Sequence, residues 1–93
     1  PEQISLEQNY PNPFNPSTTI EIRLPVQSDF TLTIFDILGR KVRSFEYQRV
    51  PAGTHKVVWD GRDERGWKSA SGVYICRLHA GQSTQTQRML LLK

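Results

Sequence analysis

Apolar and polar residues alternate in short runs along this chain, and turn-forming residues separate the runs. In residues 18–24 the side chains of Ile20, Ile22 and Leu24 fall on one face. A period of two is typical of a β-strand that buries one face. Similar runs occupy residues 30–36, 55–59, 72–78 and 85–92, and a less regular one occupies residues 41–47. None of the runs has the apolar stripe of a helix, so we expect these segments to be strands.

The spacing of the runs predicts the fold class. They follow one another at intervals of about 8–12 residues, which is typical of an all-β sandwich or barrel. None of the six glycines interrupts a run, so the glycines mark turns. Short connections favour antiparallel pairing, because parallel strands need long crossovers. With 93 residues the chain has room for one domain.

The N-terminal part differs in composition from the rest. Residues 9–16 hold three of the six prolines, and proline cannot donate a hydrogen bond to a sheet. We expect residues 1–17 to form an extended, Asn- and Pro-rich lead-in and residues 18–93 to form the sandwich. Tyr10 and Phe14 are expected to anchor the lead-in by packing on it. The chain begins at Pro1 and not at a methionine, so we expect a piece of a longer protein.

Charge and hydropathy exclude two classes of partner. The net charge is +3, from 12 basic and 9 acidic residues that are interspersed along the chain. Nucleic-acid binding needs a clustered basic patch, so we do not expect it. No stretch approaches the ~18 apolar residues of a membrane span, so we expect no membrane insertion.

The sequence contains no recognisable motif of a catalytic site. His55 and His79 are the only histidines, and neither lies beside a serine or cysteine nucleophile motif. Ser71 precedes a glycine but lacks the strand-to-helix context of a nucleophile elbow. Cys76 lies within a run, between Ile75 and Arg77, and no cation-rich loop surrounds it, so we expect a buried, unreactive thiol. We therefore expect no catalytic residue, no cofactor and no enzyme activity.

One acidic loop suggests a metal site as an alternative to a turn. Asp60, Asp63 and Glu64 lie close to two glycines and could supply oxygen ligands to Ca²⁺. The spacing of an EF-hand loop is missing, and Arg62 and Arg65 offset the charge. We expect a turn in which the aspartates bind backbone amides, with a Ca²⁺ site as the alternative.

The two tryptophans have different expected roles. Trp59 alternates with Val57, which places it in the core. Trp67 follows a glycine in a turn and is the better candidate for a contact surface, such as one that stacks a sugar. The residues by themselves thus favour a binding, structural or targeting module.

Five motifs in order resemble those of a known family. They are the lead-in at residues 9–16, the segment 32–42 with its Asp-x-x-Gly-Arg pattern, Ala-Gly-Thr-His, Trp-Asp-Gly-Arg-Asp and Ser-Gly-Val-Tyr. Together with the basic-apolar-Lys ending they resemble the type IX secretion system C-terminal sorting domain, type A, of the Por secretion system. The motif positions are Asn12, Pro13, Phe14, Asn15, Pro16, Asp36, Gly39, Arg40, Gly53, Trp59, Asp60, Gly61, Gly72 and Tyr74. The middle motifs are also similar to the Ig-like domain of the flagellar hook-capping protein, which lacks the lead-in.

The resemblance implies a fold, a location and partners. The fold is an Ig-like antiparallel β-sandwich of about seven strands. Such domains follow a cargo domain in the same chain, pass through the periplasm and are read by the type IX translocon at the outer membrane. A sortase-like peptidase then removes them at the cell surface and can attach the cargo there. The protein would be secreted or held at the cell surface of a Gram-negative bacterium, and the sequence leaves its oligomeric state open.

The C-terminal segment is the expected address. It consists of Arg88, Met89, Leu90, Leu91, Leu92 and Lys93. If residues 85–93 form an edge strand, a translocon could read the segment by adding a strand to it. The alternative is that this strand only completes the core. Two other functions remain open: an Ig-like assembly module of the flagellar-cap type, and an accessory sugar-binding domain.

Overall fold

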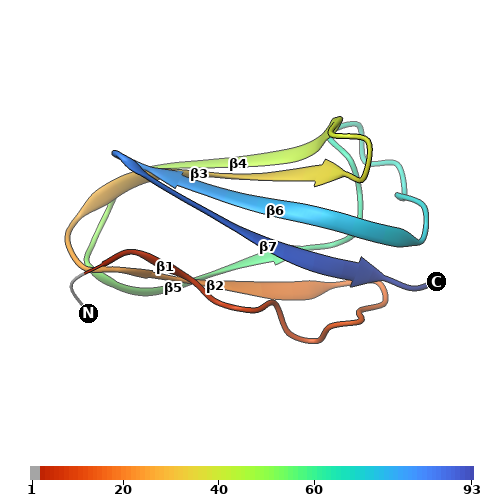
Figure 1. Cartoon of the computed structure of the whole chain (residues 1–93), viewed down its shortest axis with the longest axis horizontal. Helices are drawn as coiled ribbons and strands as arrows, with labels where there is room; N and C mark the ends of the chain where they lie inside the picture. The colour runs from red at the N-terminus through yellow and green to blue at the C-terminus, as the bar shows by residue number, and fades with distance from the viewer. Residues whose placement is uncertain (1–2) are drawn as a thin grey trace.

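The computed structural model describes residues 3–93, in which all regular structure is β-strand (Figure 1). Seven strands lie in this part of the chain. They are β1 (Ser5–Leu6), β2 (Thr18–Leu24), β3 (Ser28–Asp36), β4 (Lys41–Val50), β5 (Gly53–Trp59), β6 (Gly72–Ala80) and β7 (Ser83–Leu91). Each strand expected from the alternating runs is present, most of them longer than expected.

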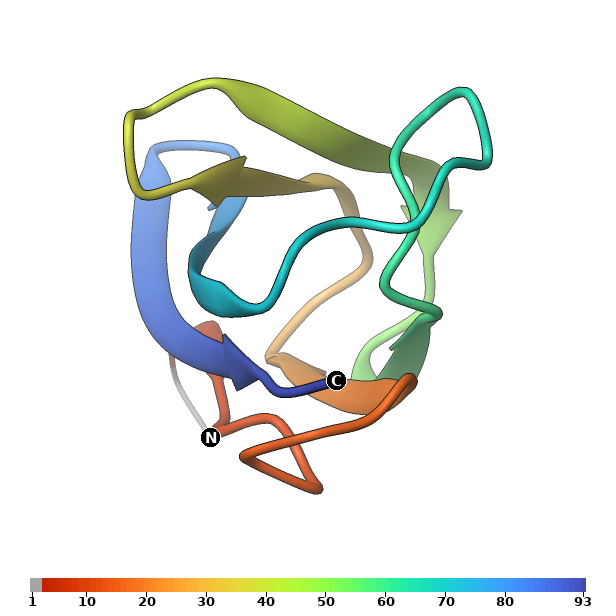
Figure 2. The ribbon, with the colours of Figure 1, turned by 90° about the vertical axis from the view of Figure 1, so that its right-hand side faces the viewer.

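The strands form two antiparallel sheets that enclose one core. The three-stranded sheet has the order β1-β2-β5, and the four-stranded sheet has the order β4-β3-β6-β7. Viewed from the end, the two sheets surround the interior of a sandwich (Figure 2). The prediction of an all-β, Ig-like antiparallel sandwich is confirmed.

The core is made by the inward-facing residues of both sheets. In β2 every second side chain is buried, from Thr18 to Leu24. Phe30, Leu32 and Ile34 of β3 do the same in the other sheet. Alternation therefore sets the register, since a slip of one residue would turn the whole apolar set outward.

The lead-in contributes to the core. Ile4, Leu6 and Phe14 are 8%, 7% and 2% exposed. Residues 5–6 form β1, a strand that the sequence did not predict, which pairs with β2. The lead-in and the strands thus share one apolar interior.

Tyr10 corrects the expectation that both aromatic residues of the lead-in anchor it. Phe14 is buried, whereas the Tyr10 side chain is 80% exposed. The backbone of Tyr10 pairs with Thr19 through two hydrogen bonds of 2.9 and 2.8 Å. Directly opposite residues of an antiparallel pair share a face. Thr19 lies opposite the exposed Val58, so the Tyr10 ring projects from the outer face.

Residues 3–93 contain no helix of the length and apolar character that a membrane crossing requires.

Candidate functional site

The expected address, residues 88–93, divides into core and surface positions. Met89 and Leu91 are 1% and 2% exposed and face the interior. Arg88, Leu92 and Lys93 are exposed. A partner can therefore reach the side chains of Arg88, Leu92 and Lys93 but not those of Met89 and Leu91.

The outer edge of β7 is occupied by the lead-in. The Phe14 N–H donates to the Leu90 carbonyl at 2.9 Å, and the Leu92 N–H donates to the Phe14 carbonyl at 3.0 Å. Between them, the Leu90 N–H donates to the Asn12 side-chain oxygen at 3.0 Å. This pairing makes Phe14 and Leu91 a parallel bridge.

Side-chain amides continue this cover toward the start of β7. The Gln8 amide donates to the Arg88 carbonyl at 3.2 Å. Gln85 binds the backbone of the segment beside it, accepting from the Leu6 N–H at 2.8 Å and donating to the Ile4 carbonyl at 2.8 Å. The lead-in therefore hinders strand addition to residues 88–92, because the Arg88 carbonyl, both Leu90 backbone groups and the Leu92 N–H already have partners.

Phe14 is held by an aromatic cluster in the core. Its ring centroid lies 5.5 Å from that of Trp59, and Trp59 lies 5.3 Å from Tyr74 in an edge-on arrangement. Trp59 is fully buried, and its indole N–H donates to the Arg62 carbonyl at 2.9 Å. The prediction that Trp59 belongs to the core is confirmed. The cluster joins the lead-in, β5 and β6.

Gly61 lets the lead-in approach the loop after β5. Its φ is +78°, and a Cβ at this position would lie 2.9 Å from the Pro16 carbonyl oxygen. A side chain would therefore have to displace backbone, besides adopting a conformation that L-residues rarely take. The glycine of the Trp-Asp-Gly motif is required by this contact.

The Asp-x-x-Gly-Arg motif forms the hairpin turn between β3 and β4. The Asp36 carboxylate accepts from the backbone N–H groups of Leu38 and Arg40, both at 2.9 Å, and from the Arg40 guanidinium at 2.7 Å. Gly39 has φ +84°. The Arg40 N–H, above all, holds the pKa of the Asp36 carboxyl below its ordinary value, and the Arg40 guanidinium and the Leu38 N–H lower it further.

Two further motif regions are also structural. Gly53 and Gly72 are the first residues of β5 and β6. The Tyr74 hydroxyl donates to the Ala70 carbonyl at 2.6 Å, which ties β6 to the segment before it. The pKa of this hydroxyl is raised, mainly because the group is partly buried.

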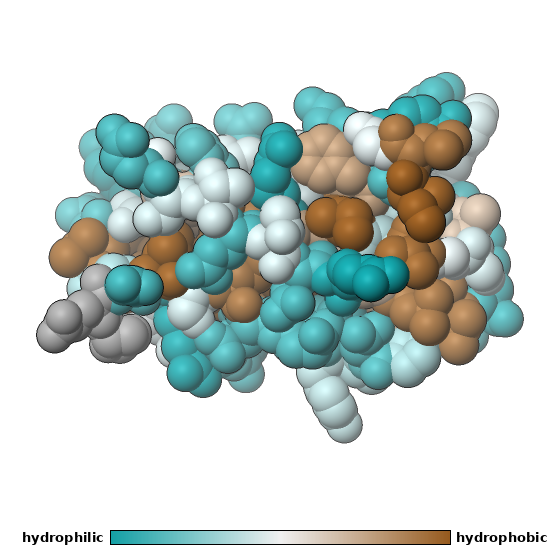
Figure 3. Space-filling view, viewed as in Figure 1, coloured by the Kyte–Doolittle hydropathy of each residue, from teal (hydrophilic) through white to brown (hydrophobic). Residues whose placement is uncertain are grey.

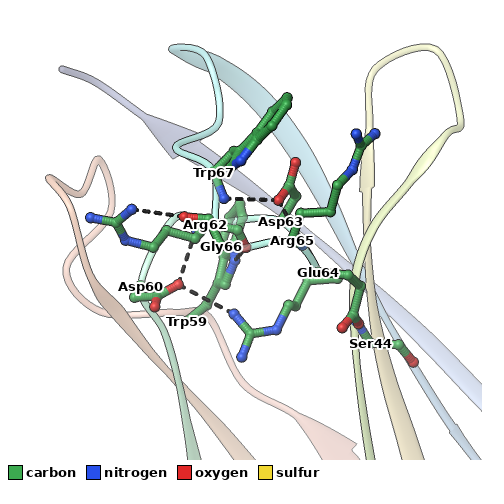
Figure 4. A network of polar contacts seen from close by, with 10 residues as sticks. Ser44, Trp59, Asp60, Arg62, Asp63, Glu64, Arg65, Gly66 and Trp67 are labelled. Atoms are coloured by element: carbon green, nitrogen blue, oxygen red, sulfur yellow. Dashed lines mark hydrogen bonds and ion pairs between the residues drawn. The ribbon is translucent and has the colours of Figure 1, made fainter.

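The carboxylates of the acidic loop bind different backbone groups (Figure 4). Asp60 accepts from the Arg62 N–H at 3.0 Å, and Glu64 accepts from the Ser44 N–H of β4 at 2.7 Å. Asp63 accepts from two amides further along its own turn. Among residues 3–93 there is no group of three acidic, histidine or cysteine side chains placed to hold a metal ion. Asp60 and Asp63 thus bind backbone amides, as expected of a turn.

Trp67 lies at the surface of the same loop, as the sequence predicts. Its side chain is 64% exposed. The Arg65 guanidinium lies 4.9 Å from the ring centroid and covers part of the ring. A sugar that stacks on this ring would therefore have to share it with the Arg65 guanidinium.

The remaining candidate residues are held by local contacts. Cys76 is fully buried, and burial raises the pKa of its thiol to about 12. His55 contacts the Pro51 carbonyl at 2.7 Å, and His79 contacts the Thr84 hydroxyl at 3.0 Å.

Asn9 and Gln85 hold the lead-in in place by side-chain hydrogen bonds, a role that the sequence did not reveal. Asn9 is 3% exposed, and its amide donates to the Thr18 hydroxyl at 2.9 Å and to the Pro11 carbonyl at 3.2 Å. Gln85 binds residues about eighty positions away. No local pattern announces either contact, because polar residues are common in loops and at strand edges.

Comparisons with known proteins agree on the fold. The family model of the FlgD Ig-like domain matches residues 12–84. No curated protein matches the chain. Among solved structures, dimeric latent PorU from Porphyromonas gingivalis is 23% identical, with a TM-score of 0.81 over 99% of this chain. PorZ from the same organism is 23% identical, with a TM-score of 0.67 over 96%.

FlgD proteins are similar as well. FlgD from P. aeruginosa is 23% identical, with a TM-score of 0.64 over 80% of this chain, and FlgD from Xanthomonas campestris is 17% identical, with a TM-score of 0.66 over 94%. At these identities the similarity shows the fold alone. The chain spans 9% of PorU, 12% of PorZ, and 58% and 64% of the two FlgD chains.

Proposed function

The chain belongs to the FlgD Ig-like domain family, and from this premise we propose that it is a non-catalytic sorting module for the type IX secretion system. It directs a cargo protein in the same chain across the outer membrane. Its partners are the translocon and a sortase-like peptidase at the cell surface, which removes the module or attaches the cargo. The cargo passes through the periplasm and ends secreted or at the cell surface.

The observation that carries the proposal is the unit formed by the lead-in and β7. The FlgD family model ends at residue 84 and so leaves out most of β7. The similarity to PorU extends over 99% of the chain with a TM-score of 0.81, against 0.64 and 0.66 for the two FlgD structures. PorZ is described as an essential surface component of the type IX secretion system. A lead-in that binds the last strand suits a module whose C-terminal surface must stay constant behind different cargoes.

The exposed side chains of residues 88–93 carry the address in this proposal. The lead-in occupies the edge of β7 around Leu90, so recognition falls to the side chains of Arg88, Leu92 and Lys93. The Lys93 N–H donates to the Ser71 hydroxyl at 3.0 Å, which holds the end of the segment beside the start of β6. β1 and the C-terminus lie toward opposite ends of the sandwich (Figure 1), so a preceding cargo domain leaves this surface free.

The test is a cargo fusion in a host with a working type IX system. The chain is joined to a fluorescent reporter, and its extracellular yield and melting temperature are measured. We expect export by the wild type, and loss of export in the Arg88→Ala/Lys93→Ala variant with a near-unchanged melt. The matched control is Arg23→Ala/Lys56→Ala, which removes two exposed cations from the other sheet and should be exported normally.

Two outcomes would contradict the proposal. A wild-type fusion that stays inside the cells would exclude the sorting role. Normal export of the Arg88→Ala/Lys93→Ala variant would exclude these side chains as the address. Deletion of Leu92 and Lys93 also removes the hydrogen bond from the Leu92 N–H to the Phe14 carbonyl. The melting temperature of this variant must therefore be measured together with its extracellular yield, to separate a loss of fold from a loss of the address.

The second candidate is an assembly module of the flagellar-cap type. The family match and the similarity to two FlgD structures favour it. A gene in a flagellar operon, and loss of hook assembly on its deletion, would support this role. An enzyme or adhesin domain encoded upstream in the same reading frame would support sorting instead.

A further inference from the structure

Apolar side chains gather on the outer face of the four-stranded sheet, at one end. Phe35 of β3 lies opposite Ile75 of β6, and Val73 lies opposite Leu90 of β7. These four side chains are half-buried and alternate with inward-facing neighbours, so they point away from the core. Figure 3 shows apolar side chains gathered at the right-hand end of the molecule, where the β3–β4 turn and the end of β7 lie.

Three more exposed apolar residues extend this surface. Ile37 and Leu38 in the β3–β4 turn are 73% and 74% exposed, and Leu92 after β7 is 47% exposed. We call the seven residues the end patch. It consists of Phe35, Ile37, Leu38, Val73, Ile75, Leu90 and Leu92. An exposed apolar group of this kind on a small domain is typical of an interaction site.

The rest of the same face is polar. The next outward row along the strands consists of Thr33, Arg77 and Thr86, which lie opposite one another in β3, β6 and β7. The row beyond it contains Thr31 and His79. The end patch is therefore a local feature and not a property of the whole sheet face.

Cations border the patch from three strands. Lys41 lies opposite Phe35, and Arg88 lies opposite Ile75. The Arg77 guanidinium lies 4.5 Å from the centre of the Phe35 ring. Stacking on the ring holds this guanidinium in place while its N–H groups remain available to a carboxylate.

Carboxylates near the patch are engaged or distant. Asp36 is bound by Arg40. Glu46 is opposite Thr31, two outward positions along β3 from Phe35, and Glu64 binds the Ser44 N–H at the far edge of the sheet. The border of the patch therefore carries net positive charge.

The patch contains a shallow hollow of about 300 Å³. Its lining consists of Phe35, Asp36, Ile37, Gly39, Ile75, Arg77 and Thr86. The Asp36 carboxylate among them is paired with the Arg40 guanidinium. A concave apolar site beside an arginine is the arrangement that binds an anchoring side chain of a protein partner. A membrane surface would have no use for this hollow, since it would be met by the exposed Ile37 and Leu38.

We propose that the end patch is a docking surface for an acidic protein segment. An apolar side chain of the partner occupies the hollow, and its carboxylates bind Arg77, Arg88 and Lys41. A second copy of this chain fits poorly, because two end patches would bring like charges together. The proposal goes beyond the sorting role and applies equally to the assembly role.

Selection from random peptides displayed on phage tests the chemistry of the partner. The immobilised domain is the target, and enriched peptides are sequenced and their affinities measured. We expect enriched peptides to combine apolar residues with aspartate or glutamate. Enrichment of basic or uncharged peptides, or none, would overturn the proposal.

Substitutions test the location of the site. We expect Ile75→Glu and, separately, the exposed Arg88→Glu to weaken binding of the enriched acidic peptides by about tenfold or more. The matched control is Val58→Glu on β5, which is 58% exposed on the outer face of the other sheet and should bind normally. Circular dichroism melting of each variant identifies a loss of fold, and Arg88→Glu removes no buried group. Unchanged affinity in a folded Arg88→Glu variant would overturn the proposal.

Two further measurements exclude other occupants. Sedimentation with phosphatidylglycerol vesicles that is lost on Ile37→Ser would identify a membrane surface and overturn the protein partner. A dimer in analytical ultracentrifugation that is lost on Ile75→Glu would identify a second copy and overturn it as well. We expect a monomer that does not sediment with vesicles.

Discussion

At the scale of single residues, the two tryptophans show how strongly environment determines the effect of one substitution. Trp59 is fully buried between Phe14 and Tyr74, whereas Trp67 is 64% exposed. We expect Trp59→Ala to lower the free energy of unfolding by about 3–5 kcal/mol and Trp67→Ala to change it little. Urea denaturation of both variants measures the difference. Equal losses would contradict the assignment of Trp59 to the core and Trp67 to the surface.

A second prediction at this scale concerns the loss of stability on Gly61→Ala, with Gly66→Ala as its control. Both have positive φ, +78° and +86°, but only at Gly61 would a Cβ meet backbone, at 2.9 Å from Pro16. Gly66→Ala should cost about 1–2 kcal/mol of stability, from the left-handed conformation alone. Gly61→Ala should cost clearly more, because the lead-in must also move. Denaturation midpoints of the two variants give the comparison, and similar losses would contradict a tight contact with Pro16.

At the scale of elements, the β3–β4 turn depends on an ionised Asp36. The pKa of its carboxyl is lowered in the folded protein, so its contribution to stability is full above the ordinary pKa of 3.8 and is lost as the pH falls through the lower folded value. We expect Asp36→Asn to be less stable than the wild type at neutral pH. The difference should shrink on acidification. Denaturation midpoints at a series of pH values test this, and a constant difference would exclude ionisation as the cause.

The strands could be predicted from the sequence, and the lead-in could be predicted only in part. Alternation in residues 18–24 is local information, and it set both the strand and its buried face. The side-chain directions of Tyr10 and Phe14 depend instead on the partner each one pairs with. Tyr10 pairs with an outward-facing residue of β2, whereas Phe14 pairs with the buried Leu91.

The candidate site shows the same limit. That Trp59 is core and Trp67 surface followed from alternation and from a turn glycine. The pairing of the lead-in with β7 could not be predicted from the sequence, because the hydrogen bond between Asn12 and Leu90 joins residues 78 positions apart. The end patch was hidden for a similar reason, since it combines residues of three strands whose register only the fold determines.

At the scale of the whole molecule, the domain should be stable without a metal ion. The carboxylates of Asp60, Asp63 and Glu64 accept hydrogen bonds from backbone amides of the protein itself. We expect a chelator to leave the melting temperature unchanged, and added Ca²⁺ to leave it unchanged too. Differential scanning calorimetry measures both. A shift with Ca²⁺ that Asp60→Asn removes would establish a site in this loop after all.

The parallel bridge between Phe14 and Leu91 has a mechanical consequence. If the domain is stretched between its first and last described residues, the lead-in and the end of β7 are pulled in opposite directions along their length. The load then acts in shear on several hydrogen bonds at once, whereas the β6–β7 hairpin would open one bond at a time. Forced unfolding follows the rate of crossing the barrier to unfolding. In optical-tweezers experiments Asn12→Ala should therefore lower the rupture force, because it removes one of the bonds that share the load.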